Sequence, residues 1–188
     1  MWGVEIRDCN EIRCFQLGRF LNLSRLAVMT CLHFESLCGY EETGPLTSLP
    51  YLKICGWSSF TSFQQRGTLY APNLRVLYIY DANVLESLPR DMHCLLPSLI
   101  ELTLFSCTKL KSFPEGGLPS SIEKLVIVLC NGIESSPKGG FPPNLKELHI
   151  LGCHKPVILR KLNKSKKRYA FLSLRNLKSL DYKELQHL

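Results

Sequence analysis

The chain has 188 residues, 45% of them hydrophobic, and a formal net charge of +7. This composition is that of a folded protein, and neither a run of about 18 apolar residues for a membrane span nor the apolar core of a secretory signal is found. Six basic residues between positions 160 and 168 carry nearly all of the net charge, so no nucleic-acid-binding surface is predicted over the domain as a whole.

An apolar frame of the form L-x-x-L-x-L returns along the chain. When the last apolar residue of each copy is taken as its origin, the origins are Ile6, Val28, Ile54, Ile79, Leu104, Ile127 and Ile150, spaced by 22 to 26 residues. The positions two before, three after, six after and nine after the origin are also apolar in nearly every copy. Self-similarity at this period and with this consensus is typical of leucine-rich repeats.

We therefore predict an α/β leucine-rich-repeat solenoid, curved as a horseshoe. Each copy contributes one strand to a parallel β-sheet on the concave face and continues into an irregular or 3₁₀-like return limb. Residues 1–160 form the leucine-rich-repeat domain of about seven repeats, 161–170 a basic insertion, and 171–188 a degenerate terminal repeat or cap with Tyr182 as its origin. Because a solenoid needs end caps and nothing precedes the first repeat, we expect the residues to belong to a longer array.

The basic segment between positions 160 and 168 allows more than one interpretation. A cluster of lysines and arginines is compatible with a nuclear-localisation signal or a contact with anionic lipid. We favour a solvated insertion before the final repeat.

Five of the nine cysteines share one position of the repeat, three residues after the origin: Cys9, Cys31, Cys107, Cys130 and Cys153. In leucine-rich repeats this position points inward, where a thiol acts as a small hydrophobe and as a weak donor to backbone carbonyls. We predict stacked, free, buried thiols. Reduced cysteine in this number favours the cytoplasm, with the nucleus as an alternative.

The residues on either side of each origin point away from the core, because successive side chains of a strand alternate between faces. In the later repeats these positions are rich in apolar and aromatic residues at places that should face water. They form the candidate partner-binding site on the concave face: Tyr78, Tyr80, Thr103, Phe105, Val126, Val128, His149 and Leu151. Large exposed apolar surfaces usually mark interaction sites. Recognition of an external ligand, cover by a neighbouring domain, self-association and the absence of any role all remain open at this point.

The sequence contains no recognisable catalytic, cofactor-binding or metal-binding constellation. The five histidines and nine cysteines match no zinc signature, and no phosphate-binding glycine loop or nucleophile motif occurs. We expect a protein that is not an enzyme and that binds no cofactor, metal or nucleic acid.

Several phrases carry a family resemblance, among them Leu85-Glu-Ser-Leu88-Pro89, Leu99-Ile-Glu-Leu102-Thr-Leu104-Phe-Ser-Cys107 and Pro143-Asn-Leu145-Lys-Glu-Leu148-His-Ile150-Leu-Gly-Cys153. Over roughly residues 1–160 the chain resembles the carboxy-terminal repeats of plant intracellular nucleotide-binding leucine-rich-repeat (NB-LRR) disease-resistance proteins of the coiled-coil subgroup. The return limbs lack the L-x-G-x-I-P phrase of plant cell-surface repeat receptors.

The resemblance implies a protein-interaction module of the plant defense response and innate immunity. Its partner would be a pathogen effector, a guarded host protein or the intramolecular nucleotide-binding domain, which this chain lacks. Recognition in the family resides on the exposed strand positions. The alternative is a stand-alone repeat scaffold or adaptor, and a third reading is a pseudogene product without a selected function.

Overall fold

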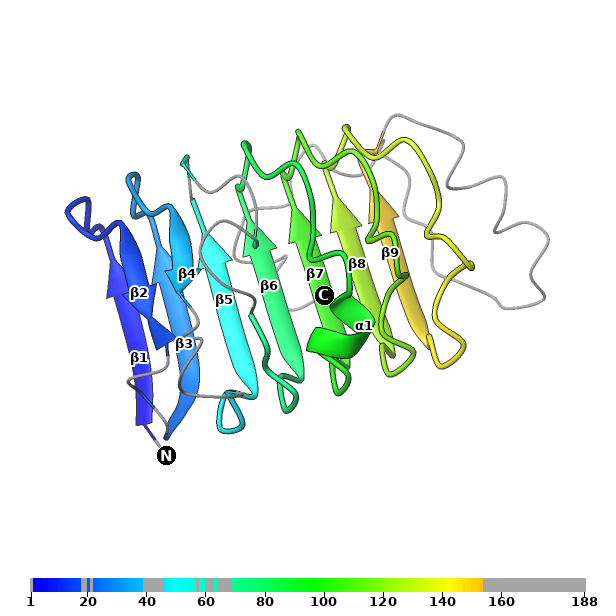
Figure 1. Cartoon of the computed structure of the whole chain (residues 1–188). Coiled ribbons are helices and arrows are strands. Elements are labelled where there is room, and N and C mark those ends of the chain that lie inside the picture. Colours follow the sequence, from blue (N-terminus) through cyan, green and yellow to red (C-terminus); the bar gives the residue numbers. More distant parts are fainter. Residues whose placement is uncertain are drawn as a thin grey trace.

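A computed structural model describes residues 2–17, 20, 22–38, 46–56, 58–59, 63 and 69–153. Within these residues, seven parallel strands lie side by side in chain order in one sheet (Figure 1): β1 (Trp2–Arg7), β3 (Leu23–Met29), β5 (Tyr51–Cys55), β6 (Val76–Tyr80), β7 (Glu101–Phe105), β8 (Lys124–Val128) and β9 (Glu147–Leu151). Between strands the chain returns to the same end of the sheet. The fold is a β-solenoid with very little helix.

The register of the sheet follows the repeat frame. Along the whole sheet each predicted origin is the partner of the next one, from Ile6 opposite Val28 to Ile127 opposite Ile150. Between β1 and β3 the register shifts once, at Trp2 and Gly3. Because the strands are in register, each position of the repeat becomes a column of side chains that runs across the sheet.

One face of the sheet forms the core of the solenoid. The column two residues before the origin is fully buried from β3 to β9, with leucine in every strand. The origins pack beside it, and apolar residues of the return limbs close the core from the other side: Phe34, Leu85, Leu110 and Ile133. Val4 and Ile6 are only partly buried, because β1 lies at the edge of the sheet.

The predicted column of thiols is present inside the turns. Cys31, Cys107 and Cys130 are free and fully buried, and Cys9 and Cys153 are free and partly buried. The Cys130 thiol donates to the Val128 carbonyl at 3.4 Å and to the Leu104 carbonyl of the preceding coil at 3.6 Å. The same pair of acceptors recurs for Cys107 and Cys153. The thiols thus donate weakly to backbone carbonyls, as predicted. The bonds to the preceding coil, which were not predicted, join adjacent coils.

A left-handed residue ends each strand, two positions after the origin. These residues have φ between 50° and 69°: Asp8, Thr30, Gly56, Asp81, Ser106, Leu129 and Gly152. The backbone N–H of each, up to Leu129, donates to the last residue of the next strand, for example from Ser106 to the Val128 carbonyl at 2.8 Å. The conformation is costly for residues other than glycine, so this ladder of hydrogen bonds holds five side-chain-bearing residues in it. The sequence analysis did not predict this feature.

The return limbs are mostly turns and irregular segments, as expected. In the described part they also contain the short helix α1 (Met92–Leu95) and a two-stranded parallel sheet formed by β2 (Cys14–Gln16) and β4 (Ser36–Cys38). Cys14 is disulfide-bonded. The expectation of reduced cysteines is therefore wrong for Cys14 and correct for the seven that are free in the described part.

Some predicted features lie outside the described residues. These are the repeat positions Trp57, Phe60, Pro156 and Leu159, the end of the predicted repeat domain at 154–160, the basic insertion at 161–170 and the terminal repeat at 171–188.

The core predicts a large effect of shortening a leucine. Leu125 has no exposed surface and lies between Leu102 and Leu148 on the neighbouring strands. We expect Leu125→Ala to lower the free energy of unfolding by about 2–5 kcal/mol through lost burial and the cavity that remains. Urea unfolding measures this change. Lys109→Ala, on an exposed return limb, should change it by no more than about 0.5 kcal/mol, and equal effects of the two would contradict the assignment of the core.

The left-handed strand ends predict a second effect on stability. Gly56 has φ of 69°, and a Cβ there would lie 3.4 Å from Thr30. We expect Gly56→Ala to lower the free energy of unfolding by about 1–2 kcal/mol, because the left-handed region is strained for alanine. Gly3→Ala is the matched control, since its Cβ would meet Arg25 at an ordinary 3.5 Å and its φ is not positive. A Gly56→Ala protein as stable as Gly3→Ala would show that the strain is absent.

Candidate functional site

The sheet face opposite the core carries three columns of side chains, at three residues before, one before and one after each origin. The predicted site residues all lie in the last two of these columns, on β6 to β9. Tyr78, Thr103, Val126 and His149 are successive register partners, and so are Tyr80, Phe105, Val128 and Leu151. The structure therefore brings the eight predicted residues together on one face.

The predicted exposure of this site is wrong for most of its residues. Val128 and Leu151 are each 1% exposed, Tyr80 4%, Val126 6% and Thr103 7%. Val126, Val128 and Leu151 form a second apolar cluster, separate from the solenoid core, with Phe105 packed against it. Large side chains at adjacent register positions pack against one another, so the alternation of a strand does not ensure exposure. Tyr78, Phe105 and His149 are half-buried.

A row of aromatic rings crosses the face from β5 to β7. The ring centroids of Tyr51 and Tyr78 lie 5.6 Å apart and those of Tyr78 and Tyr80 5.9 Å apart, both pairs edge to face. The Tyr80 and Phe105 rings follow at 5.9 Å in a tilted arrangement. These are the separations at which aromatic pairs attract one another, so the rings hold one another in place; Tyr80 is buried, and the other three are partly exposed.

Two cations lie over this row. The Arg25 guanidinium is 3.9 Å from the centre of the Tyr51 ring, and the Lys53 ammonium is 5.2 Å from the centre of the Tyr80 ring. Both are within the range of a cation–π interaction. The candidate site predicted from the sequence did not include Arg25, Tyr51 or Lys53. The column three residues before the origin would have revealed Arg25 and Tyr51, because it has the same parity as the two columns that were considered.

A charged network lies beside the apolar cluster. The Lys124 ammonium is 3.6 Å from a Glu101 carboxylate oxygen and 3.8 Å from one of Glu147. Nε2 of His149 is 3.8 Å from the same Glu147 oxygen. Nδ1 of His149 is buried and has no hydrogen-bond partner among the described residues. Positive and negative groups therefore alternate across β7, β8 and β9.

Burial changes the acidity of the tyrosines on this face. It raises the pKa of Tyr80 to about 12, with smaller contributions from nearby Tyr51 and Glu101. Burial also raises the pKa of Tyr78, and the adjacent Glu101 carboxylate raises it further. Both phenols are therefore neutral hydrogen-bonding groups at physiological pH.

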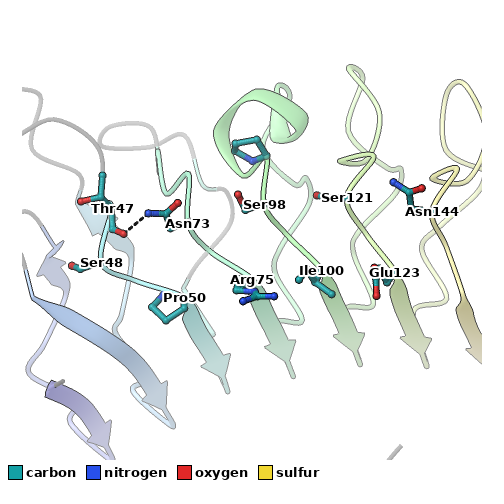
Figure 2. A pocket seen from close by; sticks show the side chains of 11 residues that line it. Thr47, Ser48, Pro50, Asn73, Arg75, Ser98, Ile100, Ser121, Glu123 and Asn144 are labelled. Carbon is teal, nitrogen blue, oxygen red and sulfur yellow. Dashed lines mark hydrogen bonds between the residues drawn. The ribbon is translucent and has the colours of Figure 1, made fainter.

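An open groove of about 800 Å³ runs along the turns that lead into the strands (Figure 2). Three of its polar side chains already bond to the preceding coil: Asn73, Ser121 and Asn144. Asn73 donates to the Thr47 carbonyl at 2.7 Å, and Ser121 donates to the Leu99 carbonyl at 2.7 Å. These hydrogen bonds are structural, since they join coils on the edge of the sheet. The sheet face opposite the core is therefore the better candidate for recognition.

The described residues contain no group of three or more histidine, cysteine, aspartate or glutamate side chains that could hold a metal ion. No helix in the same part of the chain has the length and apolar character needed to cross a membrane. The absence of an enzymatic activity and of a cofactor stays a prediction.

The tyrosine pKa values predict a dependence of stability on alkaline pH. An unfolded tyrosine ionises near pH 10, whereas Tyr80 in the folded chain ionises near pH 12. The folded state therefore holds the proton more tightly. The contribution of Tyr80 is complete below about pH 10 and is lost as the pH rises towards about 12. Thermal unfolding measured across this range should show a smaller loss of stability for Tyr80→Phe than for the wild type. Parallel losses would show that Tyr80 is not responsible.

Comparison with protein-family models, with curated proteins and with solved structures finds no match to this chain.

Proposed function

We propose that the chain is a leucine-rich-repeat module that recognises a protein partner through the sheet face opposite the core. The repeat frame and the inward thiols support the leucine-rich-repeat assignment. The β-solenoid with its seven-stranded parallel sheet is compatible with it.

The observation that carries the proposal is the contrast between the two faces of the sheet. On the core face, the column two residues before the origin is leucine from β3 to β9. On the other face, the column three residues before the origin passes from Arg25 through Tyr51 and Val76 to Glu101, Lys124 and Glu147. The core columns are constrained by packing, whereas this face column has no buried member and is free to differ. The residues of this column can therefore differ from coil to coil while the sheet that carries them stays the same.

The chemistry of this face favours a protein partner. Tyrosine and arginine are the residues that most often dominate the binding energy of protein interfaces, and here Arg25 lies over Tyr51 in a fixed geometry. The row of rings needs no ordering on binding, which lowers the entropic cost of association. The charges of Glu101, Lys124 and Glu147 alternate, whereas a nucleic-acid surface would be basic throughout.

The family resemblance gives the proposal its biological setting. It points to the recognition part of a plant intracellular immune receptor, with a pathogen effector, a guarded host protein or the receptor's own nucleotide-binding domain as the partner. The cytoplasm is the proposed compartment. The alternative is a stand-alone repeat scaffold or adaptor.

The size of the native protein distinguishes these settings. An antibody to residues 111–124 can be used to blot an extract of the source tissue. A band several times larger than 21.4 kDa supports a receptor, and a band at that mass supports the stand-alone scaffold.

A charge reversal on the face tests the recognition itself. Arg25 is exposed and does not contribute to the core. We expect Arg25→Glu to weaken partner capture at least about tenfold while the melting temperature changes little, because it removes a cation from the aromatic row. Affinity capture from plant-cell extract, with the chain as bait, measures this. Lys109→Glu makes the same charge change on a return limb and should leave capture intact. Equal capture by both variants would contradict the proposed face.

Substitutions in the apolar cluster are less direct tests. Val128→Glu would place a carboxylate where the side chain is 1% exposed. An unpaired buried charge is strongly destabilising, so a loss of capture in this variant would not separate binding from folding.

A further inference from the structure

The charged side chains of the sheet face opposite the core are divided between its two ends. Strands β1, β3 and β5 carry three cations and one carboxylate on this face: Arg7, Arg25, Lys53 and Glu5. Strands β7, β8 and β9 carry two carboxylates and one lysine there, and β6 lies between the two groups with its tyrosines. The first three strands are therefore the basic end of the face.

The net positive charge of this end comes from Arg25 and Lys53. Glu5 accepts a hydrogen bond from Nε of Arg7 at 2.6 Å, so these two opposite charges offset each other. Arg25 is exposed, and in the described part of the chain it forms no ion pair. Lys53 is partly exposed. An incoming anion would therefore meet Arg25 and Lys53 first.

The aromatic row holds both cations in place. The Arg25 guanidinium lies over the Tyr51 ring, and the Lys53 ammonium lies over the Tyr80 ring. A cation–π contact attracts the charge but supplies no carboxylate oxygen, so the guanidinium N–H groups of Arg25 can still donate to a carboxylate of a ligand. The cation is thus oriented before a ligand binds.

The register partners of the two cations towards β1 are small. Gly3 pairs with Arg25, and Ala27 pairs with Lys53. Neither side chain reaches as far from the sheet as the cation beside it. A ligand can therefore approach both cations without displacing a large neighbour on that side.

The spacing of the two cations suits an extended acidic peptide. Tyr51 is the register partner of Arg25 and lies two residues before Lys53. One strand spacing and two residue rises place the Cα atoms of Arg25 and Lys53 about 8 Å apart. Alternate residues of an extended peptide point to the same side and lie about 7 Å apart. Two acidic residues at alternate positions of such a peptide therefore match the two cations.

We infer that the basic end of the sheet face, around Arg25 and Lys53, binds an extended segment of the protein partner with acidic residues at alternate positions. The inference rests on the proposed function and names the chemistry of the partner. Glu5 on β1 and Glu101 on β7 lie on either side of the two cations. They limit the site to a short acidic segment and disfavour a nucleic acid, whose phosphates continue in both directions.

Fluorescence anisotropy with the full chain tests the inference. The probe is a short fluorescein-labelled peptide in which glutamate and serine alternate, and the control peptide has lysine in place of glutamate. The protein variants are Arg25→Glu and Lys53→Gln. Lys109→Glu, on an exposed return limb, is the matched charge reversal. Thermal unfolding by circular dichroism establishes that each variant is folded.

The expected result is saturable binding of the glutamate peptide that weakens as salt is added, because the contacts are ionic. Arg25→Glu should raise the Kd at least about fivefold and Lys53→Gln by a smaller factor, since loss of a charge weakens a complementary interface. Lys109→Glu should leave the Kd unchanged.

The absence of saturable binding, or equal binding by Arg25→Glu and Lys109→Glu, would overturn the inference. Equal binding of the lysine peptide would also overturn it. Tighter binding of a phosphoserine peptide or of a single-stranded oligonucleotide would assign the site to a different ligand and overturn it as well. If capture from extract still depends on Arg25 in these cases, the proposed function stands. Equal capture by the two charge reversals with peptide binding retained would count against the proposed function instead.

Discussion

The in-register pairing of the parallel strands is the constraint on which the rest of the structure depends. Because every origin is opposite the next one, like positions of the repeat stack into columns. The leucine column can then be fully buried, the thiols can reach carbonyls of the preceding coil, and the left-handed N–H groups can reach the next strand. A shift by one residue would exchange the two faces of a strand and bring charged side chains into the core. The repeat spacing varies between 22 and 26 residues, and the return limbs absorb this variation.

The same pairing explains which parts of the fold the sequence could predict. The origins, the leucine column and the position of the thiols follow from the period alone, since these residues have the same environment in every coil. The left-handed residues did not stand out, because the position holds aspartate, threonine, serine, leucine and glycine. Its conformation is imposed by the hydrogen-bond ladder, and the identity of the side chain is secondary. The repeat pattern also did not predict the disulfide of Cys14, because Cys14 lies outside the repeated positions.

The sequence predicted on which face the candidate site lies but did not predict the burial of its residues. Alternation along a strand correctly assigned Tyr80, Val128 and Leu151 to the face opposite the core. It could not reveal that they are buried, because a strand has the same alternation whether or not its second face is covered. The cation–π contact of Arg25 with Tyr51 depends on residues 26 positions apart that meet only across β3 and β5. The face thus combines a partly exposed aromatic and charged part around Arg25 and Tyr51 with a buried apolar part at Val126, Val128 and Leu151.

The left-handed turn at the end of each strand has a consequence for how such a molecule can change over generations. Each coil carries its own turn, its own leucine and its own side chains on the outer face, and in the described residues its strand pairs with the strands of the neighbouring coils. A gene segment encoding one coil could therefore be duplicated or deleted without redesign of the others. The inherited unit is one coil with its side chains on the outer face. Unequal exchange between gene copies would lengthen, shorten or reorder that face while the fold persists.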